Sequence, residues 1–450
     1  MPLLLALAMA VSLGPARARP LTDLAPPPQA QAEASAQTAA ASLTTDAAPA
    51  PRNIKAYTLP PDLYRKAKDL ARIRLRDDLL DFFYALAVLW LILEAKLAPR
   101  FRDWAERATR RRFLQALIFA PLLALTFLLA ELPLELYEHG VSRAYGLSVE
   151  GWGAFLLDWS KGLLLLMAVG SFLAWILYGG IRRSPRRWWL YFWLISLPLI
   201  VFLSFIEPFV IEPMFFQFAP LSQKDPALVA QIERVVARAG PVIPPDRMFW
   251  MRASEKTPTM NAYVTGIGAS KRVVVWDTNI AHETTDEILS DFGHEMGHYV
   301  LGHIWKGLIF EAAVLFALFY LGYRTVGSVL ARWGARWKIR GLDDWASLPA
   351  LLLLLTIFNF ASDPVSNAFS RHIEHQADVY GLEVTHGVIP DAGQAAADSF
   401  QVEGESSLSD PDPSPLNVFL FYDHPPIADR VSLCLTYDPW AHGEPPQFVK

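Results

Sequence analysis

Six long apolar runs constrain the fold of this chain more than any other feature of its sequence. Each is close to the length, about 20 residues, that a helix needs to cross the hydrocarbon core of a bilayer. One such run also suits a buried helix of a soluble protein, but six together predict a mainly α, multi-span membrane protein. The runs lie at 79–97, 113–135, 154–179, 188–208, 304–330 and 346–366.

The composition supports this class and excludes others. Hydrophobic residues make up 53% of the chain and charged residues 19%, below the usual quarter for a soluble domain. The apolar runs make a lipid bilayer the expected partner. The net charge of −5 gives the chain no overall positive field, so we expect no nucleic-acid partner. The single cysteine, Cys434, excludes a disulfide framework and a cysteine-based zinc site.

The N-terminal part of the chain does not resemble a folded domain. The apolar stretch Leu3–Leu13 is too short to span a bilayer and is followed by Ala16 and Ala18. Residues 1–18 are therefore predicted to be an export signal, with an uncleaved anchor as the alternative. Residues 19–56 are rich in Ala and Pro and lack the large apolar groups of a core, which predicts a disordered linker.

Lysine and arginine in the short loops indicate an orientation in the cell membrane. Three loops on one side of a six-span chain are rich in arginine, whereas the 136–153 loop opposite contains only Arg143. Because cytoplasmic loops carry the excess of positive charge, residues 209–303 are predicted to lie on the extracytoplasmic side. A basic stretch at 65–76 opposes this assignment without outweighing it. The arginine-rich loops are 98–112, 180–187 and 324–345.

Several ionisable residues lie inside the predicted spans. Charge is costly in lipid, so these groups are expected to face partners or water rather than acyl chains. Two explanations stay open, namely pairing between helices and a water-filled chamber. The residues are Glu131, Asp158, Lys161, Glu311 and Asp363.

The sequence HEMGH predicts a metal site. On a helix, His294 and His298 lie one turn apart on one face, where two imidazoles can bind one tetrahedral zinc ion. Glu295 then lies beside the metal, placed to take a proton from water. A helix is expected because Thr284 and Glu287 form a capping box. The alternative is a pair of surface histidines on an amphipathic helix.

The third ligand distinguishes the classes of zinc protease. A metzincin needs Gly and His three and six residues after the second histidine. Those positions are Leu301 and Ile304, which excludes the class. His303 is expected to be a poor ligand, because it lies on about the opposite face of a continuing helix from His294.

Better candidates follow the sixth apolar run. Glu374 and Asp378 are four residues apart and share a helix face, so Glu374 can bind the metal while Asp378 fixes the tautomer of a histidine ligand. His372 and His375 compete with Glu374, because imidazole binds zinc equally well. The residues alone leave these three candidates open.

The polar segment after the fourth run predicts a small sheet. Met248–Met251 and Lys271–Thr278 read as strands, and Asn261–Thr265 as an edge strand. A substrate peptide in extended form can pair with such an edge. Asn261 then either bonds the substrate backbone or satisfies its own turn. Farther along, the acidic, Pro- and Ser-rich residues 401–415 predict a mobile loop.

Together these motifs resemble the type I CAAX prenyl proteases, which are integral-membrane zinc endopeptidases with an HExxH site. The resemblance runs from about Tyr57 to Trp440. It rests on four motifs in the expected order, Asn261-Ala262-Tyr263, His294-Glu295-x-x-His298, Ser370-Arg371-x-x-Glu374-x-x-Ala377-Asp378 and His424-Pro425-Pro426.

The resemblance implies a barrel of membrane helices around a chamber, joined to a gluzincin-like protease domain with one zinc ion. It implies Glu374 as the third ligand and Asp378 as the partner of a ligand. It also implies Asn261 as a contact to the substrate backbone and His424 as a hydrogen-bond donor to the oxyanion. Arg371 is expected to pair with Asp378 or another carboxylate.

The expected organisation places membrane spans on both sides of the protease segment. The HExxH motif precedes the fifth span, and the third ligand follows the sixth. The predicted parts are four spans in 57–208, the HExxH segment in 209–303, two spans in 304–370 and the remaining protease residues in 371–450.

The chain departs from the family at its N-terminus. Eukaryotic members carry an additional span there and act on the cytosolic side, whereas this chain has the signal-like segment and loop charges that place the site outside. We predict a zinc metalloendopeptidase that hydrolyses peptide or protein substrates in a membrane chamber. The alternatives are a site-2-type intramembrane metalloprotease and a non-enzymatic membrane transporter or scaffold with structural zinc.

Overall fold

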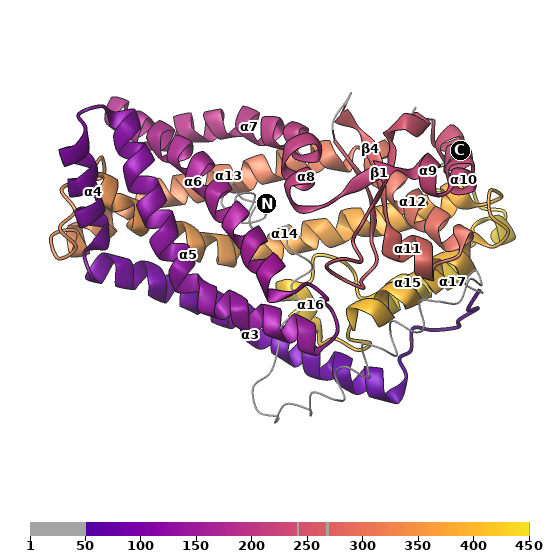
Figure 1. Cartoon of the computed structure of the whole chain (residues 1–450). Coiled ribbons are helices and arrows are strands. Elements are labelled where there is room, and N and C mark those ends of the chain that lie inside the picture. The colour runs from indigo at the N-terminus through magenta and orange to yellow at the C-terminus, as the bar shows by residue number, and fades with distance from the viewer. Residues whose placement is uncertain (1–50, 241–242, 267–269, 450) are drawn as a thin grey trace.

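The computed structural model describes residues 51–240, 243–266 and 270–449. Within them, a bundle of long helices adjoins a smaller part in which short helices surround a sheet (Figure 1). The signal-like segment 1–18 lies outside the described residues, as does the predicted linker up to residue 50.

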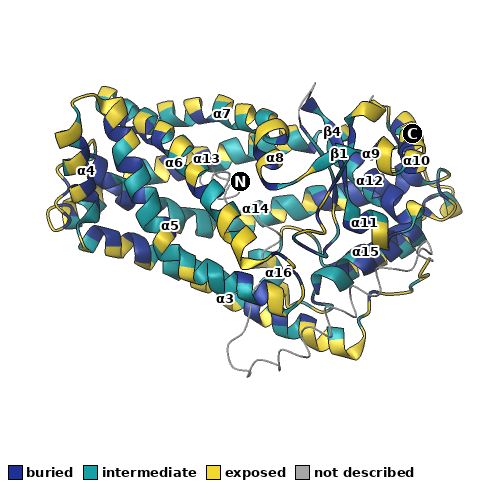
Figure 2. Cartoon of the chain, viewed as in Figure 1, coloured by how far each residue is buried: buried dark blue, intermediate teal, exposed yellow. Residues whose placement is uncertain are grey.

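Helices of 19 or more residues form the bundle. In the part of the chain that the structure describes, five helices are long and apolar enough to cross a membrane. One of the five is α7 counted together with the helical turns that continue it to Phe215. Their most apolar windows are only 17% to 39% buried within the chain, which leaves exposed faces for lipid (Figure 2). The long helices are α3 (Pro61–Glu94), α5 (Arg112–Ala144), α6 (Trp152–Arg183), α7 (Trp188–Ile206), α13 (His303–Trp333) and α14 (Leu348–Thr385).

The first predicted span stays a prediction. The segment 79–97 falls in α3, which ends at Glu94 and is not one of the five membrane-capable helices. Asp78 and Asp81 interrupt its apolar stretch, and α3 packs lengthwise against α14 and α5. α3 is therefore a more polar member of the bundle, and the other predicted spans fall in the five apolar helices.

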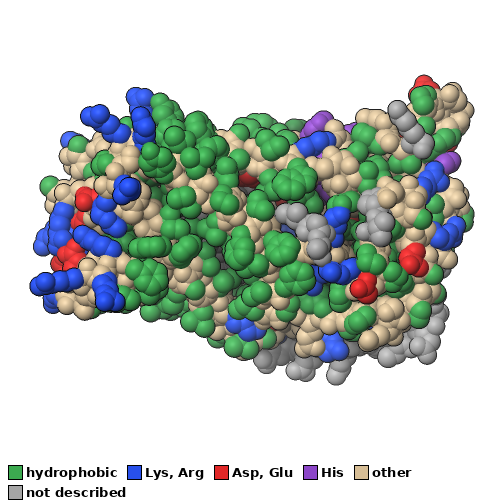
Figure 3. Space-filling model, turned by 90° about the horizontal axis from the view of Figure 1, so that it is seen from above, with side chains coloured by type: hydrophobic (Ala, Val, Ile, Leu, Met, Phe, Trp, Pro, Cys, Tyr) green, Lys and Arg blue, Asp and Glu red, His purple; other side chains and the backbone are tan. Residues whose placement is uncertain are grey.

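The three arginine-rich loops meet at one end of the bundle. α4 (Leu97–Ala108) lies there, and its Arg102 bonds the Asp344 carboxylate at 2.6 Å. The guanidinium of Arg182 lies 5.4 Å from the ring centroid of Trp345. Figure 3 shows Lys and Arg side chains gathered at this end and apolar side chains along the adjoining flank. This arrangement agrees with the predicted placement of the loops on one side.

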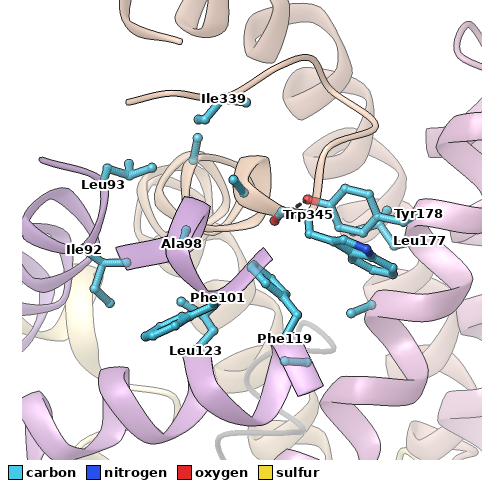
Figure 4. Packing of buried hydrophobic residues seen from close by; sticks show 14 of the residues in the cluster. Ile92, Leu93, Ala98, Phe101, Phe119, Leu123, Leu177, Tyr178, Ile339 and Trp345 are labelled. Carbon is cyan, nitrogen blue, oxygen red and sulfur yellow. Dashed lines mark hydrogen bonds between the residues drawn. The ribbon is translucent and has the colours of Figure 1, made fainter. Parts of the chain in front are cut away.

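A buried aromatic cluster joins α5, α6 and the start of α14 near this end (Figure 4). The fully buried rings of Phe119 and Trp345 stack with their centroids 6.0 Å apart. The Tyr178 hydroxyl lies 2.7 Å from Ser347 Oγ, so its polar atom is satisfied. Burying a large apolar side chain contributes about 1.5–3 kcal/mol, and the cluster therefore anchors this end of the bundle.

The sheet has four strands in the order β1-β2-β4-β3. β2 and β4 pair in parallel, and both outer pairings are antiparallel. β3 lies at an edge, as predicted, whereas the predicted strand Lys271–Thr278 is shorter because a helix begins at Asp277. The strands are β1 (Phe218–Pro220), β2 (Met248–Met251), β3 (Ala262–Thr265) and β4 (Arg272–Trp276).

An ion network ties the segment between β2 and β3 to the bundle. Asp158 and Lys161 pair at 2.7 Å, and Lys256 also pairs with Asp158. The Val149 N–H donates to the Lys256 carbonyl at 2.9 Å. Asp158 and Lys161, both in α6, therefore neutralise each other within one helix. Pairing between helices and a water-filled chamber stay predictions.

Short helices cover the sheet and complete the second part of the molecule. α12 packs mainly against α14, and α15 against α17. The helices and helical turns are η2 (Glu207–Ile211), α8 (Glu212–Phe215), α9 (Leu221–Lys224), α10 (Pro226–Ala239), η3 (Pro245–Arg247), α11 (Asp277–His282), α12 (Thr285–Val300), η5 (Trp345–Ser347), α15 (Ala392–Ser407), α16 (Pro415–Phe421), α17 (Ile427–Thr436) and η6 (Trp440–His442).

The predicted mobile loop at 401–415 is wrong for its first half, because α15 continues to Ser407. The Asp391 side chain caps the start of α15. Farther along, Gln401 Nε2 donates to the Thr58 carbonyl at 2.6 Å. The polar residues that suggested a loop thus lie on a face of α15 that forms hydrogen bonds with the N-terminal segment.

The end of the predicted disordered linker is also ordered. The backbone N–H groups of Arg52, Asn53 and Ile54 donate to the Asp398 carboxylate at 2.9, 2.8 and 3.0 Å. Residues 51–56 therefore lie against α15. A carboxylate that receives several N–H groups stabilises an extended segment without the large apolar side chains that the sequence lacks.

Candidate active site

α12 begins with the predicted capping box and presents the HExxH residues on a regular helix. The Thr284 hydroxyl accepts from the Glu287 N–H at 3.3 Å, and Glu287 Oε2 accepts from the Thr284 N–H at 2.6 Å. These bonds satisfy two N–H groups that a helix start leaves free. His294 and His298 follow one turn apart, as predicted.

Glycines let α12 and α14 approach closely. A Cβ added at Gly297 would lie 3.0 Å from Ala377 Cα, and one at Gly381 would lie 2.8 Å from the His294 nitrogen. Side chains at these positions would push the helices apart. Glycine at both positions therefore brings Glu374 opposite the two histidines.

Ligand atoms of His294, His298 and Glu374 converge between these helices. Glu374 Oε2 lies 3.3 Å from His294 Nε2, and its Oε1 lies 3.5 Å from His298 Nε2. The three ligand atoms all lie within 4.8 Å of one another. Glu374 Oε2 is buried and has no hydrogen-bond partner among the described residues. The set fits a metal, because two imidazoles and a carboxylate leave one tetrahedral position for a reactant.

The two competing histidines lie elsewhere on α14. His372 and His375 are exposed, and neither belongs to the His–His–Glu group. His372 Nε2 lies 3.1 Å from Gln376 Nε2. Of the three third-ligand candidates, only Glu374 faces the two histidines.

A second layer of charge surrounds His294. Its Nδ1 lies 2.8 Å from Asp378 Oδ1. Burial by itself lowers the pKa of His294, but the hydrogen bond with Asp378 and the nearby Glu374 carboxylate outweigh it and raise that pKa to about 10. The surroundings therefore stabilise positive charge at this position, whether a proton or a divalent cation carries it.

The sequence prediction for Arg371 is wrong in its partner. Arg371 Nη1 donates to the carbonyl oxygens of Val418, at 2.9 Å, and of Tyr422. It thereby holds α16 and the following residues against α14. The carboxylate of Asp378 pairs instead with Arg430 of α17, at 2.7 Å. Arg430 lies outside the four motifs, and no local pattern in the sequence marks it.

Glu295 lies between the histidines and the edge strand β3. Its Oε1 is 4.0 Å from His294 Nε2, and its Oε2 accepts a hydrogen bond from the Val264 N–H at 3.3 Å. Asn261 precedes the same strand and has an exposed side chain, while its backbone N–H donates to Asn279 Oδ1 at 2.8 Å.

A cavity of about 450 Å³ brings the predicted residues together. Asn261, His294, Glu295 and His424 all line it. His424 Nε2 lies 3.4 Å from Glu374 Oε2, and 52% of the His424 side chain is exposed. A donor is therefore available at the cavity wall, beside the His–His–Glu group.

His303 was expected on the far face of a helix that continues past His298, and this expectation is wrong. α12 ends at Val300, and Gly302 adopts a left-handed φ of 69° before α13 begins at His303. The turn directs His303 back, so that its Nδ1 lies 3.2 Å from His298 Nδ1. Gly302 was the available signal, because glycine commonly ends a helix in this conformation.

Comparison with known proteins agrees with this geometry. Residues 222–436 match the profile of peptidase family M48, and residues 41–217 match that of the CAAX prenyl protease N-terminal region with five membrane helices. The Bacillus subtilis protein named uncharacterized metalloprotease YhfN is 33% identical over 395 residues, or 86% of this chain and 90% of that protein. This chain belongs to peptidase family M48.

Other relatives carry the prenyl protease name. CAAX prenyl protease 1 of Saccharomyces cerevisiae is 29% identical over 389 residues, covering 82% of this chain and 81% of that protein. The crystal structure of Ste24p from S. mikatae superposes with a TM-score of 0.71 at 23% identity, covering 91% of this chain and 97% of that chain. The chain therefore has the Ste24p fold, and the predicted helical membrane architecture is confirmed.

Family membership also decides among the functional alternatives. The chain is an integral-membrane metalloprotease that hydrolyses peptide bonds. The site-2-type protease and the non-enzymatic transporter or scaffold are thereby excluded. The family implies a catalytic metal. Among the described residues, His294, His298 and Glu374 form a group that could hold one.

Proposed function

We propose that the protein is a zinc endopeptidase in which His294, His298 and Glu374 hold the metal. The observation that carries this proposal is the buried Glu374 carboxylate, which faces two imidazole nitrogens and has one oxygen without a hydrogen-bond partner among the described residues. Zinc in such a site acts as a Lewis acid and lowers the pKa of water.

Glu295 is the proposed general base. Its carboxylate lies beside His294 at the cavity wall, where it can accept a proton from the attacking water and later give that proton to the leaving amine. The Val264 N–H orients one carboxylate oxygen and leaves the other toward the histidines. Asp378 holds the His294 ring and keeps the Nδ1 proton in place.

The edge of β3 is the proposed substrate platform. The Trp276 N–H donates to the Asn261 carbonyl, so the alternate residues Ala262 and Val264 direct their backbone groups toward the free edge, where the Val264 N–H meets Glu295. A peptide in extended form can pair there, with the Asn261 amide bonding its backbone. His424, which also lines the cavity, donates to the carbonyl oxygen as negative charge develops on it.

The substrates proposed are peptides or proteins that enter the cavity from the membrane bundle. Several relatives are named CAAX prenyl proteases, so prenylated peptides belong among the substrates to be assayed. The arginine-rich end is proposed to face the cytoplasm, which places the site on the extracytoplasmic side of the cell membrane. Reporter fusions after residues 105 and 450 test this orientation, and a cytoplasmic signal at 450 would contradict it.

The zinc protease proposal is tested by Glu295→Gln in the purified full-length chain. We expect peptide hydrolysis to fall by about 100- to 10,000-fold, while metal analysis still finds one zinc per chain. Glu444→Gln, at an exposed position, is the matched control. Normal hydrolysis by the Glu295 variant would refute its role, and a wild-type protein without zinc would refute the metal site. Proteomics of membrane and exported proteins from cells with either form would then identify the substrates.

A further inference from the structure

We infer that His303 is a positioning residue that orients the proposed ligand His298 and sets its tautomer, with Gln376 holding His303. This inference rests on the proposed zinc site. It concerns a residue outside the HExxH motif, which reaches the site because α12 and α13 meet at a tight turn.

The two nitrogens of His298 face different groups. Its Nε2 faces the other two proposed ligands, 3.1 Å from His294 Nε2 and 3.5 Å from Glu374 Oε1. Its Nδ1 lies 3.2 Å from His303 Nδ1. His303 is only 2% exposed, so water does not readily replace it as the partner of His298.

Only one arrangement of protons satisfies this contact in the zinc-bound protein. A histidine that binds a metal through Nε2 carries its proton on Nδ1. His298 therefore donates to Nδ1 of His303, which must be unprotonated there and carry its own proton on Nε2. That Nε2 lies 3.1 Å from Gln376 Oε1, an acceptor.

The hydrogen bonds continue from Gln376 to His372, and each residue again donates to the next. Gln376 uses its oxygen for His303, so its amide group faces His372 Nε2, 3.1 Å away. The amide donates and the His372 nitrogen accepts. Each donor thus meets an acceptor from His298 to the exposed His372.

The two metal-binding histidines consequently have partners of different charge. His294 has a carboxylate, Asp378, whereas His298 has a neutral imidazole. Both partners fix a ring that would otherwise rotate about its side-chain bonds. The neutral partner does so without adding a second negative charge beside Glu374.

A pair of substitutions separates positioning from mere burial. Asparagine places its amide oxygen near the former position of Nδ1, whereas glutamine reaches only the position of Nε2. Zinc affinity of the purified full-length chain is measured by competition with a chromophoric chelator. We expect His303→Asn to bind zinc within about threefold of wild type, and His303→Ala and His303→Gln to bind about 10- to 100-fold more weakly.

A matched control is His375→Ala, which removes an exposed histidine next to Glu374 and should leave the zinc affinity unchanged. Wild-type affinity in His303→Ala, or equal losses in His303→Asn and His303→Ala, would overturn the inference. A wild-type chain that binds no zinc would instead contradict the proposed metal site.

Substitutions of Gln376 keep the test decisive if the His303→Ala chain fails to fold. Gln376→Leu removes the acceptor for His303 Nε2, and we expect zinc binding several-fold weaker than wild type. Gln376→Glu restores a stronger acceptor and should return the affinity toward wild type. Equal zinc affinities in the two Gln376 variants would contradict the proposed chain.

Discussion

The guanidinium of Arg430 holds both oxygens of Asp378, with Nε 3.0 Å from Oδ2 and Nη2 2.7 Å from Oδ1. The side chains are only 5% and 1% exposed. Asp378 in turn bonds His294 at 2.8 Å. A residue of the C-terminal helix α17 therefore orients a proposed metal ligand on α12 through a single carboxylate.

Replacing Arg430 should destabilise the fold. Arg430→Ala leaves the buried Asp378 carboxylate without its counter-charge, which typically costs about 3–5 kcal/mol of the free energy of unfolding. Arg430→Lys keeps the charge but not the two-pronged geometry and should cost less. Chemical unfolding of the purified protein measures both. An Arg430→Ala chain as stable as wild type would show that the pair is not needed.

His424→Ala tests the proposed oxyanion donor. Loss of one such donor lowers kcat by about 100- to 1000-fold. KM should change little, because this interaction develops only in the transition state. His442→Ala removes another exposed histidine of the C-terminal segment and serves as the control. A large rise in KM with normal kcat would indicate that His424 binds substrate instead.

The buried Glu283 and the half-buried Asp291 form an acidic pair that lines the cavity. The Ser399 hydroxyl contacts both carboxylates, 3.2 Å from Glu283. Burial raises the pKa of both groups, that of Asp291 to about 7, and repulsion by Asp291 raises that of Glu283 further. The folded protein therefore binds protons that the unfolded chain, with an Asp pKa of about 3.9, has released.

This pair should make stability depend on pH. Between about pH 4 and 7 the folded state holds more protons, so the free energy of unfolding should fall as pH rises through this range. The contribution of Asp291 is fully present below its unfolded pKa and lost above its folded pKa. Thermal unfolding of wild type and Asp291→Asn at several pH values measures it. The variant should lose less stability on raising the pH, and identical profiles would contradict the assignment.

Glu383 fastens the C-terminal segment to α14. It is fully buried, and its Oε2 accepts from the N–H groups of Phe448 and Val449 at 2.7 and 2.8 Å. Glu383→Ala leaves these donors unsatisfied, at a cost of about 1–3 kcal/mol for each buried group. We expect a lower melting temperature and faster proteolysis near the C-terminus. Glu444→Gln, at an exposed position, should change neither, and an unaltered Glu383 variant would refute the contact.

Local patterns in the sequence suffice where a function depends on residues close together in the chain. The capping box of Thr284 and Glu287 locates α12, and the helical period places His294 and His298 on one face. The edge strand β3 was also predictable, because its residues lie between glycine and turn signals. Chemistry alone left His372, His375 and Glu374 as competitors.

The rest of the site depends on tertiary contacts that carry no local signal. Arg430 meets Asp378 across 52 residues of sequence, and the polar face of α15 bonds the distant N-terminal segment through Gln401 and Thr58. The first apolar run, 79–97, contains Asp81 and Glu94, so its composition alone does not separate a membrane span from a more polar helix of the bundle. The prediction for His303 assumed that the helix continues past His298. The left-handed turn at Gly302 instead ends α12 and brings His303 back toward His298.

α14 joins the arginine-rich end of the bundle to the proposed metal ligand. It runs from Leu348 to Thr385 as one helix, and Glu374 lies roughly 39 Å along it. Membrane helices change their tilt when the hydrocarbon thickness changes. Pro364 removes one backbone hydrogen bond inside α14, between its start and Glu374, so a change of tilt at the arginine-rich end is taken up at this proline before it reaches the carboxylate.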